Sequence, residues 1–313
     1  MRNGRLSDGS RCVFICCACL ICAVWIKPVQ DRLDARVGGP GQEPDLLYFD
    51  SPAAVKKMAL GFDCLLADVY WMRAIQYYGR RDEAYKRAVR YKNLAKLLEI
   101  TSTLNPDLLD TYRSGSSFLA EADPVGAGQP QEAVKLLDKG IRAHPLEWRL
   151  PYDKGFIYFW FLKDFKTAGE IWLSASRIPE APHWLESLAA MSLSKGGSLQ
   201  VAVSIWRRQL EESNQAPIRE NARNHLLSVR VAREIWTLES LAEKYRLKFG
   251  VFPRSLQEAA RMQSRKLPLA DPLGSPYQYD SGTGSVQLSP NSKVVYLEIP
   301  ESHRQELRMT IDE

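Results

Sequence analysis

Apolar residues recur at helical spacing from Ser51 to about Phe249, and groups of helix-breaking residues interrupt them. The breaks fall at Gly79, Asn105-Pro106, residues 123–130, Pro145, Pro179, Gly196-Gly197 and Pro217. Proline lacks the backbone donor that continues a helix, and glycine adopts turn conformations that other residues avoid. The pattern therefore predicts a series of helix pairs.

Three of these pairs share small and large residues at matching positions when the chain is compared with itself at a period of about 34 residues. The first pair has Gly115, Phe118, Ala133, Leu137 and Gly140, followed by Pro145. The second has Gly155, Tyr158, Ala168, Trp172 and Ala175, followed by Pro179, and the third has Ala189, Ala202 and Trp206. Small residues let two helices approach closely and a large residue fills the adjacent space, so we expect these residues to pack the repeats.

This pattern resembles the tetratricopeptide (TPR) family, whose first helix carries W-x2-L-G-x2-Y and whose second carries an alanine, a large apolar residue and a final proline. The resemblance covers roughly residues 58–213, with a longer loop at 123–130 than the family's turn. It implies an all-α helical-repeat solenoid at residues 51–216, in which each pair buries its remaining apolar face on a neighbour. An earlier, degenerate pair is predicted at Leu65–Gly79 and Tyr91–Leu104.

Two further regions follow the repeats. Residues 217–249 carry an amphipathic stripe and are predicted to be one long helix or a tight pair that caps the apolar end of the solenoid. Residues 250–313 are predicted to be a small α+β appendix. Its hairpin consists of Tyr277–Asp280 and Ser285–Leu288 around the turn at residues 281–284, and Val294–Ile299 is a candidate third strand.

Part of this appendix resembles the C-terminal region of type II secretion pseudopilins, in which G-x-[YF]-P precedes DPWGxPYxY. The matching residues are Gly250-Val251-Phe252-Pro253 and the DPLGSPYQY run of Asp271–Tyr279. The resemblance implies a similar local fold. We expect no pilin-like N-terminal helix running into this domain and therefore no pilus assembly.

An unbroken apolar stretch, Cys12–Ile26, lies between three arginines and Lys27. A full membrane span needs about 20 residues, and flanking residues with the long Lys27 side chain can extend this shorter one. We predict a cytoplasmic tip and membrane anchor at residues 1–27, a linker at 28–50, and a body on the non-cytoplasmic (periplasmic or extracytoplasmic) side. A cleaved signal peptide is the alternative, and a lipoprotein acceptor at Cys19 or Cys22 matches less well.

The net charge of +5 is concentrated at the N-terminus, where four basic residues and Asp8 contribute +3 within the first 27 residues. A nucleic-acid-binding protein would show a concentrated basic face, so we expect no such partner. Five of the six cysteines lie in the apolar stretch and only Cys64 lies beyond it. No disulfide is therefore expected within the body, and thiolate metal ligands inside a bilayer are implausible.

No motif in the sequence indicates catalysis. The usual phosphate, dinucleotide, hydrolase and zinc-protease signatures are missing. The four histidines lie at helix ends and in the tail, where surface or structural roles are expected: His144, His183, His225 and His303. We therefore expect no enzyme, no cofactor, no metal and no small-molecule substrate.

The first helices of the repeats are the remaining candidate for function, because TPR proteins commonly hold peptides or helices on the concave side that these helices line. The expected stripe in the second pair is Tyr152, Phe156, Phe159 and Lys163, with the equivalents Tyr112, Ser116 and Leu119 before it and Glu186, Ala190 and Leu193 after it. Arg113 and Arg149 are candidate polar anchors. Burial of the same aromatic residues in the repeat core is the alternative.

The whole pattern predicts a membrane-tethered scaffold that binds other proteins. An assembly or docking factor for an envelope or membrane complex would exchange its partners. The alternative is a permanent structural subunit held in such a complex by large apolar interfaces.

Overall fold

A computed structural model describes residues 51–79, 91–123, 125–262, 267–297, 299, 300 and 303, together with residues 28 and 32. The chain divides into two units, Met1–Met58 and Ala59–Glu313. In the first unit, α2 (Pro52–Met58) begins after Ser51, whose hydroxyl accepts a hydrogen bond from the Ala54 backbone at 3.3 Å. The predicted anchor at residues 12–26 lies outside the described residues, and none of the described helices is long and apolar enough to cross a membrane.

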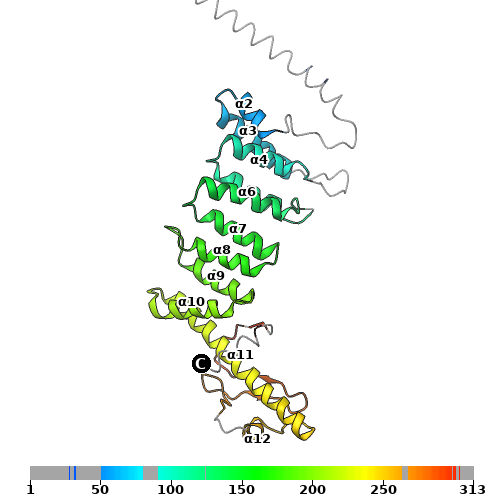
Figure 1. The fold of residues 1–313 in the computed structure, drawn as a ribbon, viewed down its shortest axis with the longest axis vertical. Coiled ribbons are helices and arrows are strands. Elements are labelled where there is room, and N and C mark those ends of the chain that lie inside the picture. The colour runs from blue at the N-terminus through cyan, green and yellow to red at the C-terminus, as the bar shows by residue number, and fades with distance from the viewer. Residues whose placement is uncertain are drawn as a thin grey trace, which may run out of the picture. The chain divides into compact units, whose positions relative to one another are not determined.

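The second unit is mostly helical, as predicted, and its helices pack against their neighbours in sequence (Figure 1). In chain order they are α3 (Asp63–Tyr78), α4 (Leu94–Leu104), α5 (Leu109–Ala120), α6 (Pro130–Ala143), α7 (Arg149–Trp160), α8 (Phe165–Ala175), α9 (Trp184–Lys195), α10 (Leu199–Glu212) and α11 (Ala216–Phe249). Helix α5 also contacts α7, and α4 also contacts α6. The helices therefore stack as successive pairs.

Local sequence signals set several helix ends. Pro130 lies in the first turn of α6. A backbone N–H at this position has no acceptor within the helix, so proline costs no hydrogen bond there. The side chain of Asp164 accepts a hydrogen bond from the Thr167 backbone at 3.0 Å and caps the start of α8. Gly250 ends α11 in the left-handed conformation, with φ of 78°.

Helix α11 is a single helix of 34 residues, which decides between the long helix and the tight pair predicted for this region. Pro217 lies in its first turn, a position that proline tolerates. This helix, predicted as a long helix or a tight pair, runs directly into the pseudopilin-like residues that begin at Gly250. The apolar stripe of α11 continues past the last repeat and forms the base on which the appendix folds.

The appendix contains α12 (Leu256–Ala260) and two short antiparallel strands, β1 (Gln278–Tyr279) and β2 (Val286–Gln287). Gln278 pairs with Gln287, and Tyr279 pairs with Val286. One apolar cluster joins the appendix to α11, with Val231, Ile235 and Leu238 from the helix and Leu256, Tyr277 and Val286 from the appendix. The hairpin is therefore held by α11.

The third strand predicted at Val294–Ile299 is wrong for the described residues of that segment. The Leu297 backbone nitrogen donates to the Ser228 hydroxyl at 2.8 Å, and that hydroxyl donates to the Val295 carbonyl at 3.2 Å. These backbone groups are thus bonded to a side chain of α11. Ile299 then joins the apolar cluster of α9, α10 and α11.

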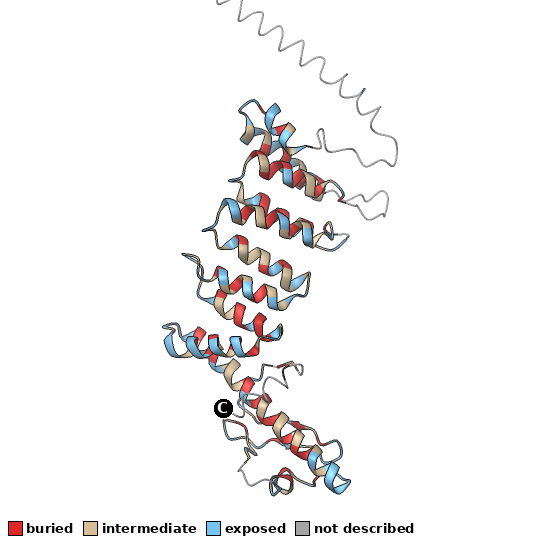
Figure 2. Ribbon diagram, in the orientation of Figure 1, coloured by how far each residue is buried: buried red, intermediate tan, exposed pale blue. Residues whose placement is uncertain are grey.

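Buried residues follow the sides of the helices that face other helices (Figure 2). The exposed residues gather on the outer faces of the stack and at the C-terminal end of α11 (Figure 2). Trp172 and Trp206, the largest side chains that are fully buried, occupy equivalent positions in the second helices of two successive pairs. The apolar clusters run from one pair into the next, since Ala168 and Trp172 of α8 pack with Leu185 and Ala189 of α9.

Candidate partner-binding surface

The glycines of the repeat pattern lie where helices approach closely. A β-carbon at Gly155 of α7 would lie 2.3 Å from the indole nitrogen of Trp172 on α8. One at Gly140 of α6 would lie 2.7 Å from the ring of Tyr112 on α5, and one at Gly115 would lie 2.8 Å from a leucine side chain of α4. A larger residue at any of these positions would push two helices apart.

The other residues assigned to repeat packing are buried or half-buried. Those with almost no exposed surface are Ala133, Leu137, Ala168, Trp172, Ala175, Ala189, Ala202 and Trp206. Phe118 and Tyr158 are half-buried. The Phe118 ring stacks on that of Tyr78 with a centroid distance of 3.9 Å, which joins α5 to α3. Phe118 therefore contributes to the contact with the preceding helix pair.

The part of the predicted partner-binding stripe that lies on α5 is buried, so the prediction is wrong for these residues. Tyr112 is 0% exposed because Gly140 leaves room for its ring, and Leu119, at 1%, lies at the bottom of a pocket between α4 and α6. Burial raises the pKa of Tyr112 to about 12. Ser116 of the same stripe is also buried. A partner that covers the outer face of α5 cannot use these side chains as exposed contacts.

The equivalent residues on α9 are also engaged within the chain. Ala190 and Leu193 are buried. Glu186 accepts hydrogen bonds from Arg208 and, at 3.3 Å, from Gln209, both on α10. It lines a polar pocket of about 490 Å³ among the ends of α8, α9, α10 and α11. Glu186 therefore tethers two helices of one pair.

On α7 one aromatic residue of the predicted stripe, Phe156, and one residue outside the prediction, Trp160, lie at the surface. Phe156 is 42% exposed and Trp160 is 56% exposed, and their rings stack with centroids 6.3 Å apart. Tyr152, one turn earlier, is half-buried, and its carbonyl accepts the Trp172 indole hydrogen bond at 2.9 Å. Residues four apart share one helix face. We call Tyr152, Phe156 and Trp160 the α7 stripe.

Cationic side chains lie at both ends of the α7 stripe. The Lys163 amino group is 5.0 Å from the centroid of Trp160, and the Arg149 guanidinium is 5.1 Å from that of Trp148. Arg149 also pairs with Glu147 at 3.0 Å. Such cation–π contacts contribute about 0.5–1 kcal/mol each at exposed sites. These contacts place Lys163 beside Trp160 and Arg149 beside Trp148.

Sequence reasoning missed Trp160 and included Phe159, which turns inward. The Phe159 ring lies 5.0 Å from that of Phe165 and 5.6 Å from that of Trp172, so it belongs to the packing of α7 on α8. The four-residue spacing from Phe156 to Trp160 was the signal that could have identified the exposed residue.

Beside the stripe, Arg113 of α5 pairs with Asp153 of α7 at 2.7 Å. Burial raises the pKa of the Asp153 carboxyl above its ordinary value, and the hydrogen bond from Arg113 opposes this rise without cancelling it. The predicted polar anchor Arg113 is therefore committed to a contact between two helix pairs. Its side chain remains partly exposed.

The histidines lie apart from one another, and the described part of the chain holds no group of three residues suited to a metal ion. The His144 ring is 2.9 Å from the Pro106 carbonyl. His225 stacks on Trp206 at 4.2 Å, and burial lowers its pKa to about 4. His303 is 1% exposed, so it is no surface residue of the tail.

No protein-family model, no curated protein and no solved structure matches this chain.

Proposed function

We propose that this chain is a membrane-tethered, TPR-like scaffold that binds a protein partner through the α7 stripe, as an assembly or docking factor for an envelope or membrane complex. The observation that carries the proposal is the stacked, exposed pair Phe156 and Trp160. The apolar stretch at residues 12–26 supports the tether. Loss of membrane fractionation on deletion of residues 1–27 is the matching test of that part.

The chemistry of the stripe suits an apolar segment of a protein, either a helix or an extended peptide. Aromatic residues dominate the energetics of interfaces because they cover a large area at small conformational cost, and hot spots are enriched in tryptophan and tyrosine. Contiguous apolar patches on the surface of a monomeric protein mark interaction sites when they are large. Tyr152 lies next to Phe156 and Trp160 and is half-buried. Its ring centroid is 5.6 Å from that of Trp184, and the two rings meet edge to face.

The test is a pair of substitutions that remove exposed rings and leave the core intact. The double variant Phe156→Ala with Trp160→Ala is expected to weaken partner binding at least about thirtyfold, which corresponds to about 2 kcal/mol. The partner is first identified by pull-down of the full chain with mass spectrometry, and affinity is then measured by calorimetry. The matched control is Leu146→Ala with Val201→Ala, which removes two other exposed apolar side chains.

Circular dichroism and a melting curve accompany the binding measurement. Folded double variant with unchanged affinity would overturn the assignment of the α7 stripe. Equal losses in the double variant and in the control would do the same, since they would indicate general surface stickiness. Tyr152 is unsuitable for this test because its ring packs against Trp172 in the repeat core.

A second candidate function, a permanent subunit of a membrane complex, is favoured by an apolar face on α3. Leu65, Val69 and Met72 are 64%, 42% and 54% exposed on one side of that helix, and Phe62 just before it is 68% exposed. Obligate interfaces bury such surfaces in the assembled state. Co-purification with partners at fixed stoichiometry, together with aggregation of the chain expressed alone, would favour this candidate over exchange of partners.

A further inference from the structure

A pocket of about 450 Å³ lies between α4 and α6, and basic side chains surround it. Its basic residues are Lys92, Lys96, Lys135, Lys139 and Arg142, and its acidic residues are Glu99 and Glu132. These side chains together carry a net charge of +3, whereas the whole chain beyond residue 27 carries +2. A net positive charge thus gathers around one pocket of the described chain, the α4–α6 pocket.

The two acidic residues are engaged by lysines of their own helices. Glu99 pairs with Lys96 at 3.0 Å, and Glu132 pairs with Lys135 at 2.7 Å. Exposed pairs of this kind contribute little and exchange readily with other partners. Among the described residues, Lys92 and Arg142 have no carboxylate within ion-pair distance. Positive charge is therefore available at the rim.

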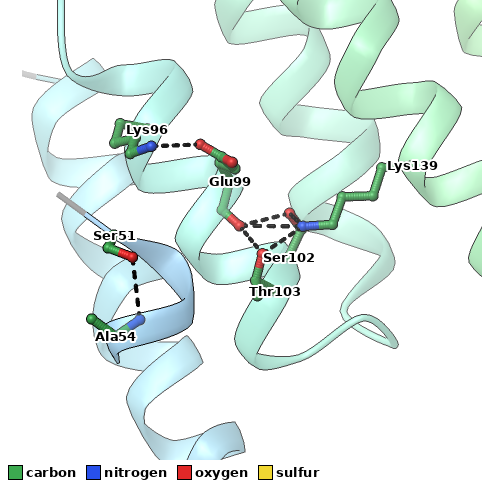
Figure 3. A network of polar contacts seen from close by, with 7 residues as sticks. All are labelled: Ser51, Ala54, Lys96, Glu99, Ser102, Thr103 and Lys139. Carbon is green, nitrogen blue, oxygen red and sulfur yellow. Dashed lines mark hydrogen bonds and ion pairs between the residues drawn. The ribbon is translucent and has the colours of Figure 1, made fainter. Parts of the chain in front are cut away.

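Lys139 is held at the rim by the last turn of α4 (Figure 3). Its amino group lies 2.7 Å from the Thr103 hydroxyl, 2.9 Å from the Ser102 hydroxyl and 3.3 Å from the Glu99 carbonyl oxygen. These three oxygens are uncharged acceptors, and the end of a helix favours a nearby cation. The cation is therefore oriented before any ligand arrives.

The bottom of the pocket is apolar. Leu119 and Leu136 are buried there, and Ala95 is half-buried beside them. An inorganic anion would contact only the charged rim and would leave the remaining surface of Leu136 and of Ala95 in water, while a nucleic-acid duplex is too wide to enter a pocket of this volume. The volume falls within the range of about 300–1,000 Å³ that is typical of ligand pockets. A ligand with an apolar side chain flanked by carboxylates matches the pocket, because the apolar group fits the bottom and the carboxylates fit the basic rim.

We infer that the α4–α6 pocket binds an acidic peptide segment of a protein partner, with one apolar side chain against Leu136 and with carboxylates against Lys135 and Arg142. A cleft of one charge sign raises the local concentration of oppositely charged ligands. None of these residues belongs to the α7 stripe, so this site goes beyond the proposed function, and either can fail without the other.

The test uses the full chain and a fluorescein-labelled peptide, Glu-Glu-Leu-Glu-Glu, in an anisotropy titration up to 1 mM. Charge reversal at two exposed residues, Lys135→Glu with Arg142→Glu, is expected to weaken binding at least tenfold. The matched control, Arg207→Glu with Arg223→Glu, changes the net charge equally at exposed positions on α10 and α11 and should stay within twofold. Raising the salt concentration should weaken the wild-type complex.

Two comparison ligands test the pocket's bottom and the ligand class. Replacing the leucine of the peptide by serine should weaken binding at least threefold, because the apolar contact is lost. Equal loss in both charge-reversed variants, or no binding of the glutamate peptide at 1 mM, would overturn the inference. Complete displacement of the peptide by inorganic phosphate at constant ionic strength would also overturn it, since it would identify a phosphate site.

Discussion

Helices α5 and α7 hold equivalent positions in two successive helix pairs, but the same stripe of residues is buried on α5 and partly exposed on α7. On α5, Tyr112 and Ser116 are 0% and 1% exposed. On α7, the equivalent Tyr152 is half-buried and the equivalent Phe156 is 42% exposed. The repeat pattern alone would give both helices the same surface.

The second helix of each pair explains much of the difference. In α6, Leu137 is followed by Gly140, which leaves room for the Tyr112 ring. In α8, the equivalent positions hold Trp172 and Ala175, and the indole fills the space beneath Gly155. The Tyr152 ring then stacks on Trp172 from outside, with centroids 6.3 Å apart. The size of one buried residue therefore decides which part of the facing helix stays at the surface.

The largest expected effect is a difference in stability between an alanine substitution on α5 and one on α7. Tyr112→Ala should lower the free energy of unfolding by about 3–5 kcal/mol, because it removes a fully buried ring. Phe156→Ala should cost about 1 kcal/mol or less, because its ring is partly in water. Urea denaturation followed by circular dichroism measures both.

Tyr112→Phe is the control for that comparison. The Tyr112 hydroxyl has no hydrogen-bond partner among the described residues, so removing it while keeping the ring should change stability by about 1 kcal/mol at most. Equal costs for the alanine variants at residues 112 and 156 would contradict the difference in burial between α5 and α7.

A second prediction concerns the contact between Gly155 and Trp172. Gly155→Leu should destabilise the fold by about 3 kcal/mol, because the new side chain would occupy the space of the indole ring. Combining it with Trp172→Leu, which copies the first pair, should restore part of that loss in a double-mutant cycle. Additive losses in thermal melts would show that the two residues are not in contact. Gly282→Ala, in an exposed turn, is the control.

The smallest expected effect is a pH dependence of stability, and it concerns the rings that cover the two buried tryptophans. Trp206 is covered by His225, whereas Trp172 is covered by Tyr152. The His225 pKa falls from about 6.5 in the unfolded chain to about 4 in the folded one, since burial disfavours the charged ring. The unfolded state therefore binds the proton first, and stability is lost as the pH falls from 6.5 to 4.

After allowance for partial solvent exposure, this loss should be about 2 kcal/mol. His225→Phe keeps a ring on Trp206 and removes the titration, so the variant should lose less stability than the wild type between pH 7 and pH 4. Urea midpoints measured across this range make the comparison. Identical pH profiles for the two proteins would show that His225 titrates normally in the folded state.

Much of the architecture follows from local patterns in the sequence. Helical spacing, breakers and caps are short-range features, so the helix pairs and the hairpin turn could be placed from residues such as Asn105, Asp164 and Gly250. The glycines and alanines of the repeats indicated where helices approach, because only small residues fit there. Composition also indicated that the body beyond residue 27 is nearly neutral.

Exposure, by contrast, depended on residues far apart in sequence. Whether a stripe on the first helix is core or surface depends on the volume opposite it, as Trp172 and Gly140 show. The tail at residues 294–297 has the pattern of a strand, but Ser228 on α11 binds its backbone instead. Basic residues more than 40 positions apart in the sequence meet at the α4–α6 pocket. Periodicity assigns a residue to a face of its own helix, and only the packing of helices decides what covers that face.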